Sequence, residues 1–145
     1  MCNQLNLDKM GKRRFIIIIT VMLIVYACKH KPDIAPCMAG TGGSLSIVAY
    51  AAHAGISIPN YFTHFDTAFV KFGTLSSPGK NPANYDTNYV SNPGEDHIHC
   101  YGLKCGDYYI YRTAWDSVEN VRRYGGYGIS ISDTEGRKSI IVAVN

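Results

Sequence analysis

The chain has 145 residues, 46% of them hydrophobic and 17% charged, with a formal net charge of +3. Four of its 14 basic residues and one of its 11 acidic residues lie within residues 1–27, so the rest of the chain has ten of each and no net charge. Because the excess positive charge is confined to the first segment, the composition gives no support for nucleic-acid binding.

Residues 1–27 have the features of a secretory signal peptide. A basic segment precedes the apolar run Phe15–Ala27, which is 13 residues long and too short for the ~20 residues of a membrane-spanning helix. The segment Val25–Cys28 resembles the lipobox of bacterial lipoproteins, in which signal peptidase II cleaves before the cysteine and the thiol carries diacylglycerol. This resemblance implies a lipid on Cys28 that attaches the mature chain to a membrane. Because the residues from Met10 onward also make a complete basic region, translation can start at Met10.

Residues 28–43 form a polar segment rich in proline and glycine, typical of a tether between a lipid and a folded domain. In residues 44–145 the apolar side chains follow period two, and turn residues interrupt the chain about every ten positions. Seven strands are predicted, at 44–52, 67–73, 85–90, 97–101, 108–115, 126–132 and 139–144. No longer segment has a helical period, so we expect a single all-β domain, a seven-stranded antiparallel β-sandwich.

Two sequence resemblances concern the folded domain. The segment Gly102–Tyr108, GLKCGDY, resembles the G-L-x-x-G-x-Y signature of transthyretin-like sandwiches, which include collagen-adhesin B-type repeats and carboxypeptidase regulatory domains. The chain also resembles small lipoproteins of Bacteroidota-type bacteria, in the blocks GTGGS (40–44), DTAFVKF (66–72), GEDHIH (94–99) and GLKCGDYYIY (102–111). These resemblances imply a transthyretin-like fold and an anchor in the outer membrane of the cell envelope, but no biochemical activity. The residues after Cys28 lack the acidic cluster associated with surface export in this group, which favours a periplasm-facing position.

Three cysteines of the folded part, Cys37, Cys100 and Cys105, allow one disulfide in an oxidising compartment. Side chains alternate along the predicted strand 97–101, so Cys100 shares a face with Ile98. If Ile98 faces the core, Cys100 is a buried thiol. Cys37 and Cys105 are then the accessible pair, and we expect a Cys37–Cys105 disulfide. A Cys100–Cys105 bond would contradict this assignment of faces.

Histidines and carboxylates gather in the segment Gly94–His99, GEDHIH. His97 and His99 are two residues apart on one predicted strand, so both project from the same face and their imidazoles can converge on one ion. Glu95 and Asp96 directly precede them. The pattern therefore allows a metal site at this strand, as the alternative to a purely structural role.

His53 and His64 flank a loop that can supply further ligands if it folds over the same end of the sheet. We expect no cofactor; if these histidines do bind an ion, imidazole ligands favour Zn²⁺ or Cu²⁺. The first explanation is nevertheless structural, since His-x-His also occurs by chance on solvent-facing strands, where neighbouring acids simply accept hydrogen bonds from it.

Tyrosine and arginine residues gather in the glycine-rich segment RRYGGYG. We expect Arg122, Arg123 and Tyr124 to form a loop that faces a partner, because recognition surfaces are enriched in these residue types. For the preceding strand, YYIYRTAW, the sequence does not determine which alternate set of side chains faces the core. Turning Tyr108 inward also turns Arg112 inward, which a bulge or a buried partner such as Asp116 would have to relieve.

Catalytic signatures such as Gly-x-Ser-x-Gly and His-Glu-x-x-His do not occur in the sequence, and we expect no enzyme. The first expected function is that of a membrane-anchored lipoprotein whose β-sandwich recognises or scaffolds an envelope protein, peptide or glycan. The alternative is a lipoprotein that binds Zn²⁺ or Cu²⁺ through His97 and His99.

Overall fold

Eight β-strands and one short 3₁₀ helix make up the part of the chain that the computed structural model describes, residues 37–60 and 63–145. They are β1 (Thr41–His53), β2 (Ile56–Ser57), β3 (Thr67–Phe72), η1 (Pro82–Asn84), β4 (Thr87–Val90), β5 (His97–Leu103), β6 (Gly106–Asp116), β7 (Val121–Ile131) and β8 (Glu135–Ala143). The predicted signal peptide, Cys28 and the tether up to residue 36 lie outside the described residues. Among the described residues, no helix has the length and hydropathy to span a membrane.

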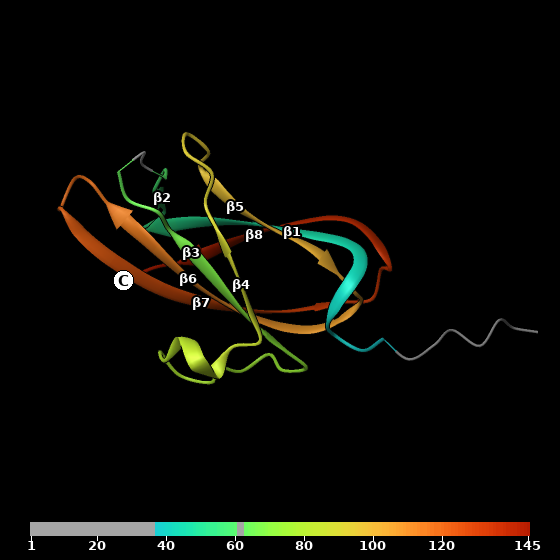
Figure 1. Cartoon of the computed structure of the whole chain (residues 1–145). Coiled ribbons are helices and arrows are strands. Elements are labelled where there is room, and N and C mark those ends of the chain that lie inside the picture. Colours follow the sequence, from blue (N-terminus) through green and yellow to red (C-terminus); the bar gives the residue numbers. More distant parts are fainter. Residues whose placement is uncertain (1–36, 61–62) are drawn as a thin grey trace, which may run out of the picture. The chain divides into compact units, whose positions relative to one another are not determined.

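The strands form two sheets of four strands each, one lying over the other (Figure 1). In the first sheet β1 pairs with β5 and β8, and the two-residue strand β2 pairs with the end of β1. In the second sheet the order is β4-β3-β6-β7. The prediction of an all-β sandwich is confirmed, and each of the seven predicted strands overlaps a strand of the structure.

The core lies between the sheets and is built from alternate residues of each strand, as the period-two pattern requires. Its buried side chains include Leu45, Ile47, Ala49, Ala51, Ala68, Val70, Ile98, Cys100, Tyr108, Ile110, Ala114, Ile131, Ile140 and Val142. The same alternation places every second residue of β5 on the outer face of the first sheet. That outer face carries the candidate site.

The prediction of a purely antiparallel sandwich is wrong for one strand pair. β1 and β8 are parallel, in register from Ser44 opposite Glu135 to Ala52 opposite Ala143. The chain reaches β8 from β7, which belongs to the other sheet. A connection between sheets, unlike a tight hairpin, leaves the direction of the next strand open.

The predicted boundary between tether and domain, at residue 43, also lies too far along the chain. The compact unit begins at Cys37, and β1 begins at Thr41, which pairs with Leu103. The backbone N–H of Lys104 donates to the carbonyl of Gly40 at 3.0 Å, so these residues already belong to the sandwich.

The expected disulfide is confirmed: Cys37 and Cys105 are bonded, with their Cα atoms 5.0 Å apart. Cys100 is a free thiol with 0% exposure, beside the equally buried Ile98. Burial raises the pKa of the Cys100 thiol to about 12. The assignment of faces on this strand from alternation therefore holds.

The inward face of β6 carries Tyr108 and, fully buried, the charged Arg112. Arg112 does not pair with Asp116, the buried partner that the sequence suggests, because Asp116 accepts from Arg123 instead. Arg112 donates to the carbonyl oxygen of Ala49 and, at 2.8 Å, to Oδ1 of Asn60. Burial lowers the pKa of Arg112 to about 10, so the guanidinium remains charged at neutral pH and depends on these acceptors.

Candidate metal centre

The two histidines predicted to bind metal lie on the outer face of β5. His97 and His99 are partly exposed, with 20% and 29% of their side chains accessible, whereas Ile98 between them is fully buried. β5 pairs with β1 in this region, with His97 opposite Tyr50 and His99 opposite Val48. The strand backbone thus fixes the positions from which both imidazoles project.

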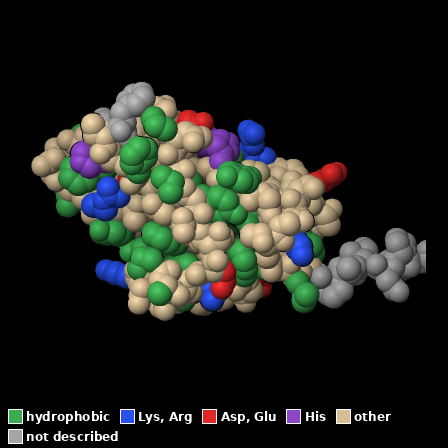
Figure 2. Space-filling view, viewed as in Figure 1, with side chains coloured by type: hydrophobic (Ala, Val, Ile, Leu, Met, Phe, Trp, Pro, Cys, Tyr) green, Lys and Arg blue, Asp and Glu red, His purple; other side chains and the backbone are tan. Residues whose placement is uncertain are grey.

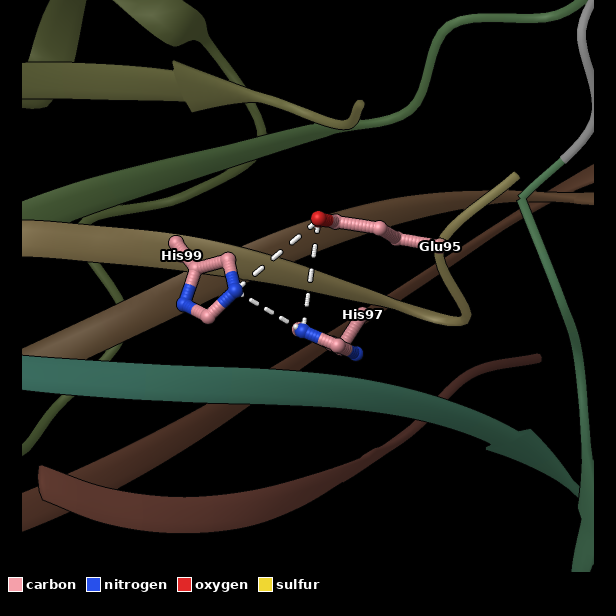
Figure 3. A group of neighbouring side chains, drawn as sticks. All are labelled: Glu95, His97 and His99. Carbon is pink, nitrogen blue, oxygen red and sulfur yellow. Dashed lines mark hydrogen bonds and ion pairs between the residues drawn. The ribbon is translucent and has the colours of Figure 1, made fainter. Parts of the chain in front are cut away.

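Three ligand atoms converge at this place (Figure 3). Nε2 of His97 and Nε2 of His99 are 2.9 Å apart, and Oε2 of Glu95 is 3.9 Å from each of them. A point equidistant from the three atoms lies about 2.1 Å from each, which equals the distance at which zinc binds imidazole nitrogen and carboxylate oxygen. Within the part of the chain that the structure describes, these are the three His, Cys, Asp or Glu residues whose ligand atoms all lie within 4.8 Å of one another.

A second carboxylate orients His97. Nδ1 of His97 donates to Oδ1 of Asp96 at 2.6 Å, and this hydrogen bond lowers the pKa of Asp96. With Nδ1 protonated, Nε2 is the unprotonated nitrogen of the neutral ring and points at the other two ligand atoms. Carboxylates that hold metal-binding histidines in this way are common around metal ions in proteins.

Tyr50 completes the surroundings of His97. Its ring packs against the His97 imidazole, with centroids 5.2 Å apart, and the His97 and His99 rings meet edge to face at 4.5 Å. The His97 ring is therefore held from one side by Asp96 and contacted by Tyr50. A site whose ligands are positioned in advance binds an ion at a smaller entropic cost.

His53 and His64, predicted as further ligands, do not join this group. Side chains alternate along β1, so His53 projects to the opposite face from Tyr50, and its Nδ1 lies 2.9 Å from the carbonyl oxygen of Val144. His64 stacks on Trp115 of the other sheet, with ring centroids 4.0 Å apart. Figure 2 shows histidine side chains at two separate places on the face in view. The prediction of these two ligands is wrong.

Glu95 is a candidate ligand that the sequence pattern does not assign. It precedes β5 and lies outside the strand, so alternation does not give the direction of its side chain. A turn ends just before it, where Gly94 has a φ of 84°. The available signal was its position two residues before His97, next to the acidic residue that orients this histidine.

The prediction of a partner-facing loop at Arg122–Tyr124 is also wrong. These residues lie within β7, because the hairpin from β6 turns earlier, and β6 and β7 pair from Asp116 opposite Val121 onward. Arg123 is buried and donates to Oδ2 of Asp116 at 2.7 Å.

The other two residues of that predicted loop also have partners in the structure, and the partner carboxylate of Arg122 is the fully buried Asp66. Nη1 of Arg122 donates to Asp66 at 3.4 Å and to the Phe65 carbonyl at 3.2 Å. Tyr124 stacks on Tyr111, with ring centroids 6.1 Å apart. All three predicted recognition residues therefore make contacts within the domain.

Comparison with protein-family models, with curated proteins and with solved structures finds no significant match to this chain. The resemblance to transthyretin-like lipoproteins accordingly stays a prediction. The function has to be argued from the site itself.

Proposed function

We propose that this protein is an envelope lipoprotein whose β-sandwich binds one divalent transition-metal ion through Glu95, His97 and His99, without catalysing a reaction. The observation that carries the proposal is the convergence of three ligand atoms on a point about 2.1 Å from each, the bonding distance for such ions. The donor set, two imidazoles and a carboxylate, suits Zn²⁺ and Cu²⁺.

The charges around the site support the same proposal. Glu95 and Asp96 are two carboxylates beside two imidazoles, and a divalent cation balances their charge. Without an ion, the two histidine nitrogens face each other at 2.9 Å, where at most one proton can lie between them. An ion uses both lone pairs at once.

The cellular side of the proposal is supported by sequence alone. The lipobox-like segment Val25–Cys28 supports a lipid on Cys28, and the resemblance to small bacterial lipoproteins supports an anchor in the outer membrane. The lack of an acidic cluster after Cys28 supports a periplasm-facing position. Recognition of an envelope protein, peptide or glycan stays a prediction without an assigned surface, because the residues expected to form it lie in β7.

The test is titration calorimetry with Zn²⁺ and, separately, Cu²⁺ on residues 33–145 without a histidine tag. This fragment contains the whole compact unit Cys37–Asn145, with its core and disulfide, and omits His30, which would bind copper next to a new N-terminus. We expect one ion per chain, and we expect His97→Ala/His99→Ala to abolish stoichiometric binding. Asp96→Asn should weaken binding about 10- to 100-fold, as for other residues that orient a ligand.

The matched control is His53→Gln/His64→Gln, which also removes two histidines but leaves the three converging residues intact. We expect its affinity to equal that of the unaltered protein. Equal loss of binding in both double variants, or binding of several ions per chain that neither double variant alters, would mean that the metal binds nonspecifically and would overturn the proposal.

A further inference from the structure

The turn that leads to Glu95 is fixed by its own sequence. Pro93 and Gly94 form a β-turn between Asn92 and Glu95, in which the Glu95 N–H donates to the Asn92 carbonyl at 3.3 Å and Gly94 has a φ of 84°. Proline followed by a glycine with positive φ is typical of a type II turn. The residues at the two ends of the turn, Asn92 and Glu95, are thereby brought side by side.

The backbone of Glu95 is also held from inside the domain. The backbone N–H of Asn60 donates to the Glu95 carbonyl at 3.2 Å, and Nδ2 of Asn60 donates to the His97 carbonyl at 2.9 Å. Asn60 is itself fixed, because it is only 6% exposed and its Oδ1 accepts from the buried Arg112 at 2.8 Å. These contacts lie outside the cluster of ligand atoms and restrain the main chain on both sides of Asp96.

The side chain of Glu95 is restrained by one residue outside the cluster. Nδ2 of Asn92 donates to Oε2 of Glu95 at 3.1 Å. Oε2 is the same oxygen that lies 3.9 Å from Nε2 of His97 and from Nε2 of His99 (Figure 3). Because a carboxylate oxygen has two lone pairs, Oε2 can face an ion while it accepts from Asn92. Ordering a glutamate side chain costs conformational entropy, and this contact reduces the part of that cost that falls on ion binding.

We infer that Asn92 is a positioning residue of the metal site, whose side-chain amide holds the ligand oxygen of Glu95 toward the two imidazoles. The inference rests on the proposed metal-binding function and adds to it a residue that does not itself bind the ion. Asn92 is exposed and lies outside the core, so packing does not account for its contact with Glu95. Residues that orient a ligand contribute about 10- to 100-fold to metal affinity. We expect the lower end of this range, because water competes for an exposed hydrogen bond.

The test is a double-mutant cycle on residues 33–145, in which Asn92→Ala and Glu95→Ala are made separately and together. The titrant in calorimetry is Cu²⁺, which binds imidazole sites more tightly than Zn²⁺, so that binding stays measurable without Glu95. We expect Asn92→Ala to weaken binding about 10-fold when Glu95 is present and by less than about twofold when Glu95 is absent. The matched control is Asn88→Ala, which removes an exposed asparagine of β4 and should leave the affinity unchanged.

The outcomes separate this inference from the proposed function. An unchanged affinity in Asn92→Ala would overturn the positioning role and leave metal binding intact. A loss of the same size with and without Glu95 would do so too, because the substitution would then act on the turn as a whole and not on the ligand. Failure of the unaltered protein to bind an ion stoichiometrically would overturn the proposed function, and this inference with it.

Discussion

The Cys37–Cys105 disulfide connects the segment before β1 to the turn between β5 and β6, and its removal is the sharpest test of what holds this domain together. The two cysteines are 68 residues apart in sequence. Other contacts hold the same ends together: Lys104 donates to the Gly40 carbonyl at 3.0 Å, and the Gly40 N–H donates to the hydroxyl of Tyr108 at 3.1 Å. The native arrangement should therefore survive without the bond.

The expected cost follows from the loop that the bond closes. A crosslink lowers the entropy of the unfolded chain by an amount that grows with the logarithm of loop length, and a separation of 68 residues corresponds to about 4 kcal/mol at 25 °C. Domains of this size have a free energy of unfolding of about 5–15 kcal/mol. Replacing both cysteines by serine should consequently remove a large share of the stability without abolishing the fold.

The assay is urea denaturation of the Cys37→Ser/Cys105→Ser variant beside the disulfide-bonded protein, both carrying Cys100→Ala so that no third thiol can exchange. We expect a loss of about 4 kcal/mol in the free energy of unfolding and a steeper dependence on urea, because the uncrosslinked chain exposes more surface when it unfolds. A loss below about 1 kcal/mol, or an unchanged urea dependence, would refute the account in which the bond acts on the unfolded chain.

Three further predictions concern buried groups. Asn60→Ala removes the acceptor that Arg112 Nη2 reaches at 2.8 Å, and it should lower the free energy of unfolding by about 2 kcal/mol in urea denaturation, since the stranded donor belongs to a charged group. The Cys100 thiol, whose pKa burial raises to about 12, should resist iodoacetamide at pH 8 in the native protein and react in denaturant, as counted by mass spectrometry. Gly106→Ala should lower the free energy of unfolding by at least about 2 kcal/mol, because φ is +141° and the new Cβ would lie 2.3 Å from the backbone nitrogen of Ala39. Gly55→Ala is the comparison: φ is +82° but nothing lies within 4 Å of the new Cβ, so the expected loss is about 1–2 kcal/mol from the backbone conformation alone.

The strands of this protein could be predicted from sequence because a half-buried strand needs alternation and turn residues at its ends, both of which are local properties. β6 illustrates this: Tyr108 and Ile110 face the core and are fully buried, and Tyr109 between them is only half-buried. The same local rule placed Cys100 inside and so identified the disulfide partners.

The direction of β8 could not be predicted in this way. Alternation gives the buried face of Ile140 and Val142 but is the same for a parallel and an antiparallel neighbour.

Arg123 shows a related limit. Its burial depends on Asp116 across the β6–β7 pair, and a charged residue next to glycines is, on composition alone, expected in a loop.

Two of the three residues of the candidate metal site could be predicted from the sequence and the third could not, and the boundary between them is the start of β5. His97 and His99 lie inside the strand, where spacing determines direction. Glu95 lies before it, where direction depends on a turn, and His53 depends on the face of another strand. Residues that reach a site through loops or through other strands require the tertiary structure.

The arrangement of β5 also separates binding from folding. Ile98 and Cys100 form part of the core on one face, while His97 and His99 project from the other. A register shift of one residue would exchange the two sets, burying the imidazoles and exposing the apolar side chains. The pairing with β1 that keeps the core intact therefore also keeps both imidazoles on the outer face. Substituting the histidines alone should leave that pairing and the core intact, because both side chains lie outside the core. We therefore expect that the candidate metal-binding face can be altered in a protein that remains folded, so that a loss of metal binding in such variants would report on the candidate ligands rather than on the sandwich.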